Sequence, residues 1–486
     1  MLDLNDFITE RGGDPKKIKE SQRRRGAPEE VVDEVIALYE EARKVRYGVT
    51  QVGSQMNALL KQIGMKKKVA HSAHVYTNKE DASELIAEKT ALDKTKKEAE
   101  DKAIAVENER DRKIRTIGNY VHDSVPVSQT EDDNPIVKTW TPEDAAMDRP
   151  DCLSHHEVLT RLDGYDPERG VKIVGHRGYC LTGYGLFLNL ALVNYGLEFL
   201  FNKGYTPNQP PQFMLKDLMA KTAQLEQFDE ELYKVTEGED SSTDKYLIAT
   251  SEQPLSALHD GEWLQEKDLP IKYAGYSTCY RKEAGAHGKD AWGIFRVHQF
   301  EKIEQFVLTK PEDSWKAFDD MMNTSEEFYK SLGLPYQVVS IVSGALNNAA
   351  SKKYDLEAWF PFQKEYKELV SCSNCLDYQS RALEIRFGQK KATDLKKTYV
   401  HALNATLCAT ERTLCCVLEN YQREDGIEVP EVLRKYIPGQ PEFLPYTKEL
   451  PKDTTSARVK AKQQAKAGAA AGGADEAAKK LKDLQV

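Results

Sequence analysis

Charged side chains at even spacing flank a glycine-bearing segment in the stretch from Tyr280 to Glu304, YRKEAGAHGKDAWGIFRVHQFEKIE. If the flanks are strands, Arg281 and Glu283 share one face, because successive side chains of a strand alternate between faces. One face of the second flank then carries Arg296, His298, Phe300, Lys302 and Glu304. A hairpin would bring the two sets together. The opposite parity of the aliphatic Val297 and Ile303 predicts that the other face packs into the core.

This combination of side chains suits a nucleotide together with a small zwitterion. Guanidinium groups present planar forks of donors that match phosphate or carboxylate oxygens. The carboxylates can accept from an amino group, a hydroxyl or an exocyclic amine, and Phe300 can stack on a flat ring. A surface hairpin laced with weak ion pairs is the competing interpretation, and on isolated charges alone the two carry similar weight.

The stretch resembles motif 2 of the class II aminoacyl-tRNA synthetases, in which an Arg-x-Glu strand, a loop and a second arginine-bearing strand follow one another. FRVHQFEKIE resembles the seryl-tRNA synthetase family, and about residues 1–445 are similar to its eukaryotic, cytosolic and fungal members. The resemblance implies an α+β fold, with a class II antiparallel β-sheet flanked by helices and an N-terminal antiparallel α-helical coiled-coil hairpin. The pattern alone would not separate this fold from other mixed folds.

The resemblance gives each side chain of motif 2 a task. Arg281 bridges the serine carboxylate and the α-phosphate of ATP, which is catalysis by orientation and charge neutralisation. Glu283 accepts from the adenine N6 amine, Phe300 stacks on the adenine ring, and Arg296 contacts the phosphates. This scheme requires no general base, so His298 is expected to be structural.

The serine pocket is assigned by the same resemblance. In LIATSEQPLSALH, Thr250 and Glu252 have the spacing of one strand face and hold the α-ammonium group in the family, although alone they favour a helix cap. Glu304 binds the serine hydroxyl, aided by Thr406, and Asn404 and Thr406 of HALNATLCATERTLCCVLENYQ line the pocket. A buried acceptor built for a hydroxyl rejects alanine by about 10⁴ or more, whereas threonine must be excluded by size.

Three further residues complete the implied ATP site. Arg412 opens the helix of motif 3 against the adenine and the γ-phosphate, and is assigned a catalytic role with Arg281. Glu368 and Ser371 of KELVSCSNC match ligands of a Mg²⁺ ion that bridges the ATP phosphates, and oxygen ligands suit this ion. The alternative for this fragment is an ordinary strand with a polar edge. The motif departs from the glycine-rich form of the family at Ala405, Ala409 and Thr410.

Composition limits the other classes of function. The 486 residues allow two or three domains, and the net charge of -10 argues against wholesale coating of nucleic acid. The N-terminus MLDLNDFITERGG has no signal-peptide features and no run approaches a membrane-spanning length, so we expect a cytoplasmic protein without a membrane partner. The eight cysteines are expected to be reduced. Cys372 and Cys375 form a lone CxxC, so no zinc is expected.

Apolar residues repeat with heptad spacing near the N-terminus. The seam runs through Val35, Leu38, Ala42, Val45, Val49, Val52, Met56, Leu59 and Ile63. A weaker repeat, interrupted by Lys89 and Lys96, runs from Ala82 to about Ile117, and the polar stretch 66–81 is expected to form the turn. The two repeats predict an antiparallel hairpin of about residues 27–118. Without the resemblance, an oligomerisation coiled coil would be favoured.

In the family this hairpin grips the long variable arm of tRNA(Ser). The candidate phosphate contacts are Lys66, Lys67, Lys68, Lys94, Lys96 and Lys97. A second basic cluster near the start consists of Lys16, Lys17, Lys19, Arg23, Arg24 and Arg25. The alternative for both clusters is a solvated charged face.

Residues 186–213 resemble motif 1, with a long amphipathic helix stopped at Gly204 and an extended segment through Pro210 and Pro211. In the family these elements form a homodimer interface in which the proline, here Pro211, lies against the partner's active site. In isolation, a buried helix followed by a turn would be favoured.

The predicted domains are a tRNA-binding domain over 1–118, a class II catalytic domain over 119–445, and a Lys/Ala-rich disordered or transiently helical tail over 446–486. The implied function is that of a serine–tRNA ligase in cytoplasmic translation, with L-serine, ATP and tRNA(Ser) as substrates. A catalytically inactive homologue is the first alternative, and it would be expected to lack Arg281, Glu283, Arg296 or Arg412. A synthetase for another small amino acid is the second, and Glu304 disfavours it.

Overall fold

The structure is a computed structural model that describes residues 1–72, 83–222, 228–236, 238, 243–284, 290, 292–388 and 397–451, with the side chains of 67–72, 228 and 229 excepted. Two compact units divide the chain. Unit 1 contains Met1–His122, Val127–Gln129 and Ser343–Ala349, and unit 2 contains the remainder. The predicted C-terminal tail lies outside the described residues from 452 onward.

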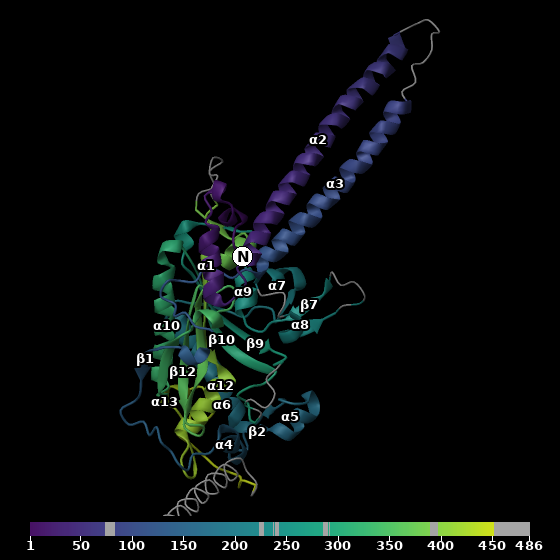
Figure 1. Cartoon of the computed structure of the whole chain (residues 1–486). Coiled ribbons are helices and arrows are strands. Elements are labelled where there is room, and N and C mark those ends of the chain that lie inside the picture. Colours follow the sequence, from purple (N-terminus) through teal and green to yellow (C-terminus); the bar gives the residue numbers. More distant parts are fainter. Residues whose placement is uncertain are drawn as a thin grey trace, which may run out of the picture. The chain divides into compact units, whose positions relative to one another are not determined.

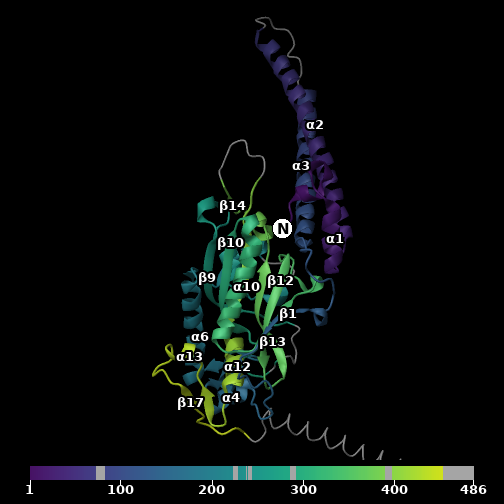
Figure 2. The same ribbon diagram turned by 90° about the vertical axis from the view of Figure 1, so that its left-hand side faces the viewer.

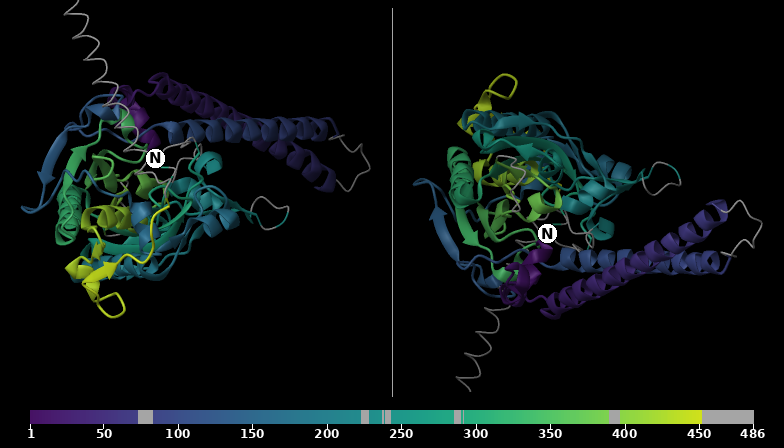
Figure 3. Two further views of the ribbon diagram at one scale, coloured as in Figure 1. Left: turned by 90° about the horizontal axis from the view of Figure 1, so that it is seen from below. Right: turned by 90° about the horizontal axis from the view of Figure 1, so that it is seen from above.

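Two long helices dominate unit 1. The helices α2 (Glu30–Ser72) and α3 (Ser83–Thr116) run side by side in every view (Figure 1, Figure 3). All nine positions of the predicted seam in α2 are buried or half-buried, and so are Lys89 and Lys96 of α3. The two lysines therefore keep positions in the seam. The antiparallel hairpin is confirmed.

The predicted turn over 66–81 begins too early, because α2 continues to Ser72. Lys66, Lys67 and Lys68 are good helix formers, and neither glycine nor proline follows them before that point, so nothing in the sequence stops the helix there. Residues 73–82 lie outside the described part of the chain.

The first helix of unit 1 is anchored through its arginines. Arg25 of α1 (Pro15–Arg25) is buried and donates to the backbone oxygens of Asn119, Leu346 and Asn347. Arg24 likewise donates to the backbone of Val121 and His122. These two members of the predicted basic cluster satisfy buried carbonyl groups, which is a structural task. Unit 1 also contains the 3₁₀ turns η1 (Leu4–Phe7), η2 (Thr9–Arg11) and η8 (Ser343–Ala345).

An eight-stranded sheet forms the centre of unit 2, and every pairing in it is antiparallel except that of β4 with β9. In spatial order the strands are β1 (Ile136–Trp140), β11 (Tyr336–Ser340), β12 (Lys352–Phe360), β13 (Glu365–Asn374), β15 (His401–Ala409), β10 (Gln299–Thr309), β9 (Ile271–Tyr280) and β4 (Thr206–Asn208). The predicted antiparallel sheet with flanking helices is confirmed.

Three helices cover one face of this sheet (Figure 2). They are α6 (Gly183–Asn202), α10 (Ser314–Ser331) and α12 (Thr410–Tyr421). Ile303 and Val307 of β10 point into the core beneath them, whereas Phe306 and Leu308 join a separate cluster on the opposite side. Val297 and Ile303 are buried, as their parity predicts.

Short elements surround the sheet. The helices are α4 (His155–Arg161), α5 (Pro167–Val174), α7 (Lys216–Thr222), α8 (Phe228–Glu231), α9 (Glu252–Ala257), α11 (Tyr378–Ala382) and α13 (Glu431–Arg434). The strands are β2 (Tyr165–Asp166), β3 (Cys180–Leu181), β5 (Phe213–Leu215), β6 (Lys234–Val235), β7 (Lys245–Leu247), β8 (Trp263–Leu264), β14 (Arg386–Phe387), β16 (Gly426–Glu428) and β17 (Phe443–Pro445). The 3₁₀ turns are η3 (Glu131–Asp133), η6 (Glu266–Asp268) and η7 (Pro311–Asp313).

The prediction that no segment approaches a membrane-spanning length is wrong for the helix α6. Within the described residues it is long and apolar enough to cross a membrane, with a mean hydropathy of 1.3. Leu188, Leu192 and Leu200 on its inner side are fully buried in the core. We therefore interpret α6 as a core helix. It ends at Asn202, and Gly204 then adopts the left-handed conformation (φ 82°), as the predicted stop requires.

Candidate active site

The charged stretch is less regular than an alternating hairpin. The strand β9 ends at Tyr280 and β10 begins at Gln299, so Arg281, Glu283 and Arg296 lie outside the ladder. Glu283 has a positive φ of 50°, which no strand residue adopts. The predicted strand flanks were too long at both ends. The backbone N–H of Arg281 nevertheless donates to the carbonyl of His298, so the two limbs stay together.

Phe300, Lys302 and Glu304 do share one face of β10, on the side away from the covering helices. Lys302 and Glu304 are 7% and 2% exposed, and Lys302 Nζ lies 2.5 Å from Glu304 Oε2. Lys302 Nζ also donates to Thr250 Oγ1 at 2.8 Å. A buried carboxylate needs such partners, because removing a charge from water without compensation is costly. The sequence analysis predicted that the Lys302 side chain lies on this face of β10 but predicted no function for it.

The second carboxylate of the pocket is that of Glu252. Its predicted strand is wrong, because Glu252 is the first residue of α9 and its backbone N–H donates to Thr250 Oγ1, a capping contact. Gln379 donates to Glu252 Oε1 at 2.8 Å. Desolvation and then the charge of Glu304 raise the pKa of Glu252 to about 7, although Gln379 and Lys302 oppose the rise. Gln379 comes from α11, and no local pattern in the sequence linked it to Glu252.

The adjacent strand supplies neutral side chains. Thr406 of β15 is the backbone partner of Glu304, and Asn404 lies two positions along the strand. Both are 7% exposed, and Asn404 Nδ2 contacts Cys375 Sγ at 3.5 Å. The departures from the glycine-rich motif fit this strand: Ala405 is buried in it and Ala409 ends it, before α12 begins at Thr410. Among the described residues, the pocket therefore contains two carboxylates, one ammonium group, two hydroxyls and two amides.

Guanidinium groups and carboxylates pair with each other at the other end of the site. Arg296 Nη1 lies 2.8 Å from Glu283 Oε2, and Arg412 Nη1 lies 3.7 Å from Glu368 Oε2. The Arg281 guanidinium sits 5.1 Å from the centroid of the Phe300 ring. A ring inserted on this side could stack on an aromatic and a cationic plane.

A β-bulge places Glu368 and Ser371 on one face of β13. Glu368 faces Glu357 and Val370 faces Leu356, which leaves Leu369 as the extra residue. Three-residue spacing in a regular strand would have put the two side chains on opposite faces. The Glu368 side chain is 48% exposed. Desolvation raises its pKa, but Arg412 and then Lys353 and Arg281 outweigh this and lower it, so the carboxylate is ionised at neutral pH.

These oxygens fit a hard divalent cation. The backbone partner of Ser371 is Asp355, which is 6% exposed and whose Oδ1 has no hydrogen-bond partner in the described structure. A carboxylate, a hydroxyl and an orphaned carboxylate oxygen are the ligand types that Mg²⁺ prefers. The described residues contain no cluster of three or more His, Cys, Asp or Glu that could hold a metal without another ligand. All eight cysteines are free thiols.

Comparison with known proteins identifies the class first. A class II tRNA synthetase core domain (G, H, P, S and T) matches residues 233–421, and a seryl-tRNA synthetase N-terminal domain matches residues 1–121. The fold and the site thus define a class II aminoacyl-tRNA synthetase.

Relatives that match nearly the whole chain identify the family within this class. The cytoplasmic serine–tRNA ligase of Candida albicans is 62% identical, over 94% of this chain and 99% of the relative. The cytoplasmic serine–tRNA ligase of Naegleria fowleri, solved with AMP, is 48% identical with a TM-score of 0.79, over 92% of this chain and 99% of that one. The Pyrococcus horikoshii seryl-tRNA synthetase, solved with ATP, is 35% identical with a TM-score of 0.78, over 92% and 100%. The chain belongs to the seryl-tRNA synthetase family.

Proposed function

We propose that this protein activates L-serine with ATP and transfers the serine to the 3′ end of tRNA(Ser) in the cytoplasm. In the first step a serine carboxylate oxygen attacks the α-phosphorus, the bond to the β-phosphate oxygen breaks, and pyrophosphate leaves. In the second step the terminal hydroxyl of the tRNA attacks the acyl carbon and AMP leaves. The observation that carries the proposal is the buried Glu304, held by Lys302 and Thr250 on the strand that also carries Phe300.

Serine is held by the buried end of the site. Glu252 and Thr250 hold the α-ammonium group, and Glu304 accepts from the hydroxyl, with Thr406 and Asn404 beside it. Within the described structure, Glu304 Oε2 accepts from Lys302 and Thr250, and no hydrogen bond to Oε1 is found. The division leaves one oxygen for the substrate hydroxyl. Alanine would leave that oxygen unpaired, which is a strong basis for its rejection.

ATP is held by the more open end. Phe300 and Arg412 contact the adenine, and Glu283 accepts from its N6 amine. Arg281 binds both the serine carboxylate and the α-phosphate, so it orients the two reacting groups and offsets their repulsion. Arg296 and Arg412 contact the remaining phosphates. Since Arg296 is paired with Glu283 and Arg412 faces Glu368, binding of ATP exchanges carboxylate partners for phosphate partners.

Mg²⁺ is the proposed cation, with Glu368 and Ser371 as protein ligands. When bound it neutralises charge that develops on the pyrophosphate leaving group. Glu368 supplies the anionic oxygen, and Arg412, 3.7 Å away, limits the excess negative charge that Glu368 brings to the phosphates.

The hairpin formed by α2 and α3 of unit 1 is the proposed site for the long variable arm of tRNA(Ser), within a tRNA-binding domain over 1–118. The Lys94 side chain is 80% exposed, and Lys97 is exposed as well. Lys96 is a weaker candidate, because it lies on the seam and pairs with Glu100 at 3.5 Å. Lys66 is half-buried, and the side chains of Lys67 and Lys68 lie outside the described residues.

A matched pair of variants tests the arm. Substituting Lys94 and Lys97 by Ala should weaken tRNA binding and flatten its salt dependence while adenylate formation is unchanged. Substituting Lys316 and Lys364, which are exposed in the catalytic unit, removes the same charge and should leave tRNA binding unaltered. Equal losses in the two double variants would contradict the assignment.

We further propose a homodimer. Large apolar side chains are exposed along α6 and the segment that follows Pro211, namely Tyr184, Leu186, Phe187, Phe201, Phe213 and Leu215. Exposed apolar surface of this kind marks an interaction site. Light scattering at micromolar concentration should give twice the chain mass of 55.0 kDa, and a stable monomer would contradict the dimer.

The experiment that tests the catalytic proposal is ATP–pyrophosphate exchange with serine, threonine, alanine and cysteine, followed by charging of tRNA(Ser). We expect exchange with serine far above the other three. Exchange with none of them would contradict the activity, and faster exchange with threonine would contradict the specificity.

A further inference from the structure

The return segment, Gly293–Arg296, leads from the motif 2 loop back into β10 and has no strand partner of its own. A backbone without ladder hydrogen bonds must satisfy its buried groups through side chains. Three side chains do so here. The Ile294 N–H donates to His155 Nε2 at 3.3 Å, Arg412 Nε donates to the Phe295 carbonyl at 3.3 Å, and Arg177 donates to the Arg296 carbonyl at 2.7 Å.

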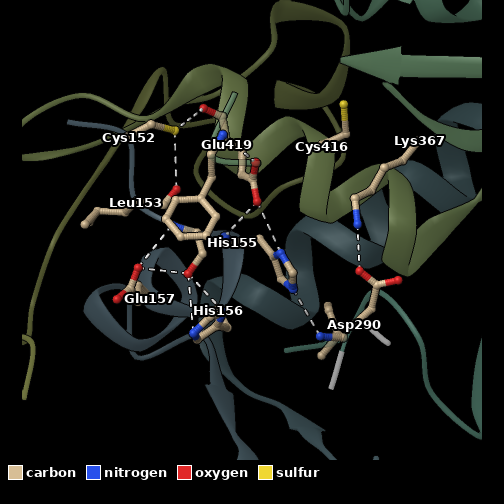
Figure 4. A network of polar contacts seen from close by, with 12 residues as sticks. Cys152, Leu153, His155, His156, Glu157, Asp290, Lys367, Cys416 and Glu419 are labelled. Atoms are coloured by element: carbon tan, nitrogen blue, oxygen red, sulfur yellow. Dashed lines mark hydrogen bonds and ion pairs between the residues drawn. The ribbon is translucent and has the colours of Figure 1, made fainter. Parts of the chain in front are cut away.

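His155 is the only acceptor among these three side chains. Its Nδ1 lies 3.4 Å from Glu419 Oε1, and Glu419 also accepts from the backbone N–H of His155. Figure 4 shows the His155 ring with Glu419 on one side. Because Nε2 accepts from Ile294, the hydrogen of the neutral ring is on Nδ1 and donates to Glu419. The imidazole therefore connects α12, the helix of Arg412, with the segment that presents Arg296.

Two further observations show that this contact is specific. A Cβ atom at Gly293 would come within 2.1 Å of His155 Nε2, and Gly293 has a φ of 75°, so the chain passes the ring edge at a place that only glycine fits. The ring also borders a cavity of about 220 Å³. Hydrogen bonds, rather than close packing on every side, fix its orientation.

We propose that His155 is a positioning residue for ATP, which holds the return segment so that Arg296 and Arg412 face the same ligand. The inference rests on the proposed function, because Arg296 and Arg412 are its ATP contacts. His155 itself contacts no substrate. Serine should be little affected, since Thr250, Glu304 and Thr406 are held by separate contacts on β10 and β15.

The contact requires that His155 Nε2 carries no hydrogen. A ring with a hydrogen on both nitrogens cannot accept from Ile294, so it would turn an attraction into a repulsion between two N–H groups. The titratable groups packed around the ring are Glu419 from α12, His156 and Glu157 from α4, and Asp290 on the cavity wall. Burial and then His155 lower the pKa of His156 to about 4, so His156 adds no charge at neutral pH.

Two substitutions separate positioning from folding. His155→Phe keeps a ring of similar size and leaves the Ile294 N–H without an acceptor. His155→Gln supplies an amide that can accept from Ile294 and donate to Glu419, but does not titrate. In ATP–pyrophosphate exchange with the full-length protein, His155→Phe should raise the KM for ATP about tenfold, with the KM for serine within about twofold. His155→Gln should bring the KM for ATP back to within about threefold of the unsubstituted value.

His155→Gln supplies a second measurement that survives if His155→Phe fails to fold. Calorimetric titration of His155→Gln with ATP should give an affinity within about threefold of the unsubstituted value, because the amide replaces the acceptor for the Ile294 N–H. His259→Phe is the matched control, because His259 also bonds a carboxylate, that of Glu262, but lies away from the return segment. It should leave both KM values unchanged.

Three results would overturn the inference: an unchanged KM for ATP in His155→Phe, equal rises in both KM values, or a KM for ATP that is as high in His155→Gln as in His155→Phe. Failure of the proposed function is distinguishable, since it would appear as no exchange in the unsubstituted protein. Calorimetric titration with ATP alone would then still test whether His155→Phe weakens ATP binding.

Discussion

The two ends of the site hold their charges in different ways. At the proposed serine end, Lys302 and Glu304 are almost completely buried, and Lys302 Nζ lies 2.5 Å from Glu304 Oε2. At the proposed ATP end, Arg412 Nη1 lies 3.7 Å from Glu368 Oε2, and the Glu368 side chain is 48% exposed. Lys302 and Glu304 lie on the same strand, and both contact Thr250. Arg412 and Glu368 lie on different elements, the helix α12 and the bulged strand β13.

This difference matches the two ligands. Serine is small, so a pocket that selects it must be organised before it binds, and a buried pair retains its geometry because screening is weak there. ATP brings several charges of its own and can displace carboxylates from the guanidinium groups. Substitutions at the serine end should therefore abolish selection, while those at the ATP end should weaken binding in smaller steps.

The largest effect is expected from Glu304→Ala. Loss of the hydroxyl acceptor should lower kcat/KM for serine by about 10³ or more, because the rejection of the wrong ligand depends on that buried group. Binding of ATP, measured by calorimetry, should change less than about threefold. A serine response that is unaltered in pyrophosphate exchange would remove the central assignment. Glu312→Ala, at an exposed carboxylate of η7, is the control for loss of charge alone.

Lys302→Met should rank second and should reduce stability as well as activity. Removing one partner of a buried ion pair leaves an uncompensated charge, at a cost of about 3–5 kcal/mol. We expect kcat/KM for serine to fall about 100-fold and the free energy of unfolding to fall by about 3–5 kcal/mol.

The double variant Lys302→Met with Glu304→Gln sharpens this test, because it has no buried charge at either position. It should recover most of the stability in urea denaturation without recovering serine activation. Recovery of both would mean that the pair serves folding alone.

Arg296→Ala tests the ATP end and should have a smaller effect. The substitution removes a guanidinium group and frees Glu283, which would then repel the phosphates. The KM for ATP should rise about 10- to 100-fold while the KM for serine stays within about threefold. Arg169→Ala, at a surface pair with an 81% exposed arginine, removes the same charge and should change neither value. A larger change for serine than for ATP would reverse the comparison between the two ends.

The sequence predicted the part of the site on the regular strand β10 better than the irregular parts, and the reason is physical. Parity along β10 is a local property, so it placed Phe300, Lys302 and Glu304 on one face. The ATP end depends on irregular backbone: Glu283 has a positive φ, and a bulge at Leu369 brings Glu368 and Ser371 together. Only the resemblance to a known family identified these residues as neighbours.

Contacts between distant segments were beyond any local pattern. Gln379 on Glu252 and His155 on Ile294 each join elements more than 100 residues apart. The length of α2 was missed for a different reason, because a polar sequence was interpreted as a turn although its lysines favour a helix. In the heptad seam, by contrast, Lys89 and Lys96 kept the repeat despite their charge.

The smallest expected effect concerns the protonation of Glu252, whose pKa of about 7 lies above its ordinary value of 4.5. In the proposed site the carboxylate form of Glu252 accepts from the serine ammonium group, so the KM for serine should fall as the pH rises through about 7. The folded protein holds a proton that the unfolded chain has released. The stability that this proton contributes is therefore complete below about pH 4.5 and is lost as the pH rises through about 7.

Glu252→Gln should consequently stabilise the protein relative to the unsubstituted chain by about 1–3 kcal/mol at pH 8, and by less at pH 5. Urea denaturation at the two pH values measures the difference. The pKa of Glu411 is also raised to about 7 by burial, but Glu411 is present in both proteins and its contribution cancels. A stability difference that is independent of pH would show that Glu252 is already ionised without serine, and that Lys302 and Gln379 neutralise the pocket more fully than the raised pKa implies.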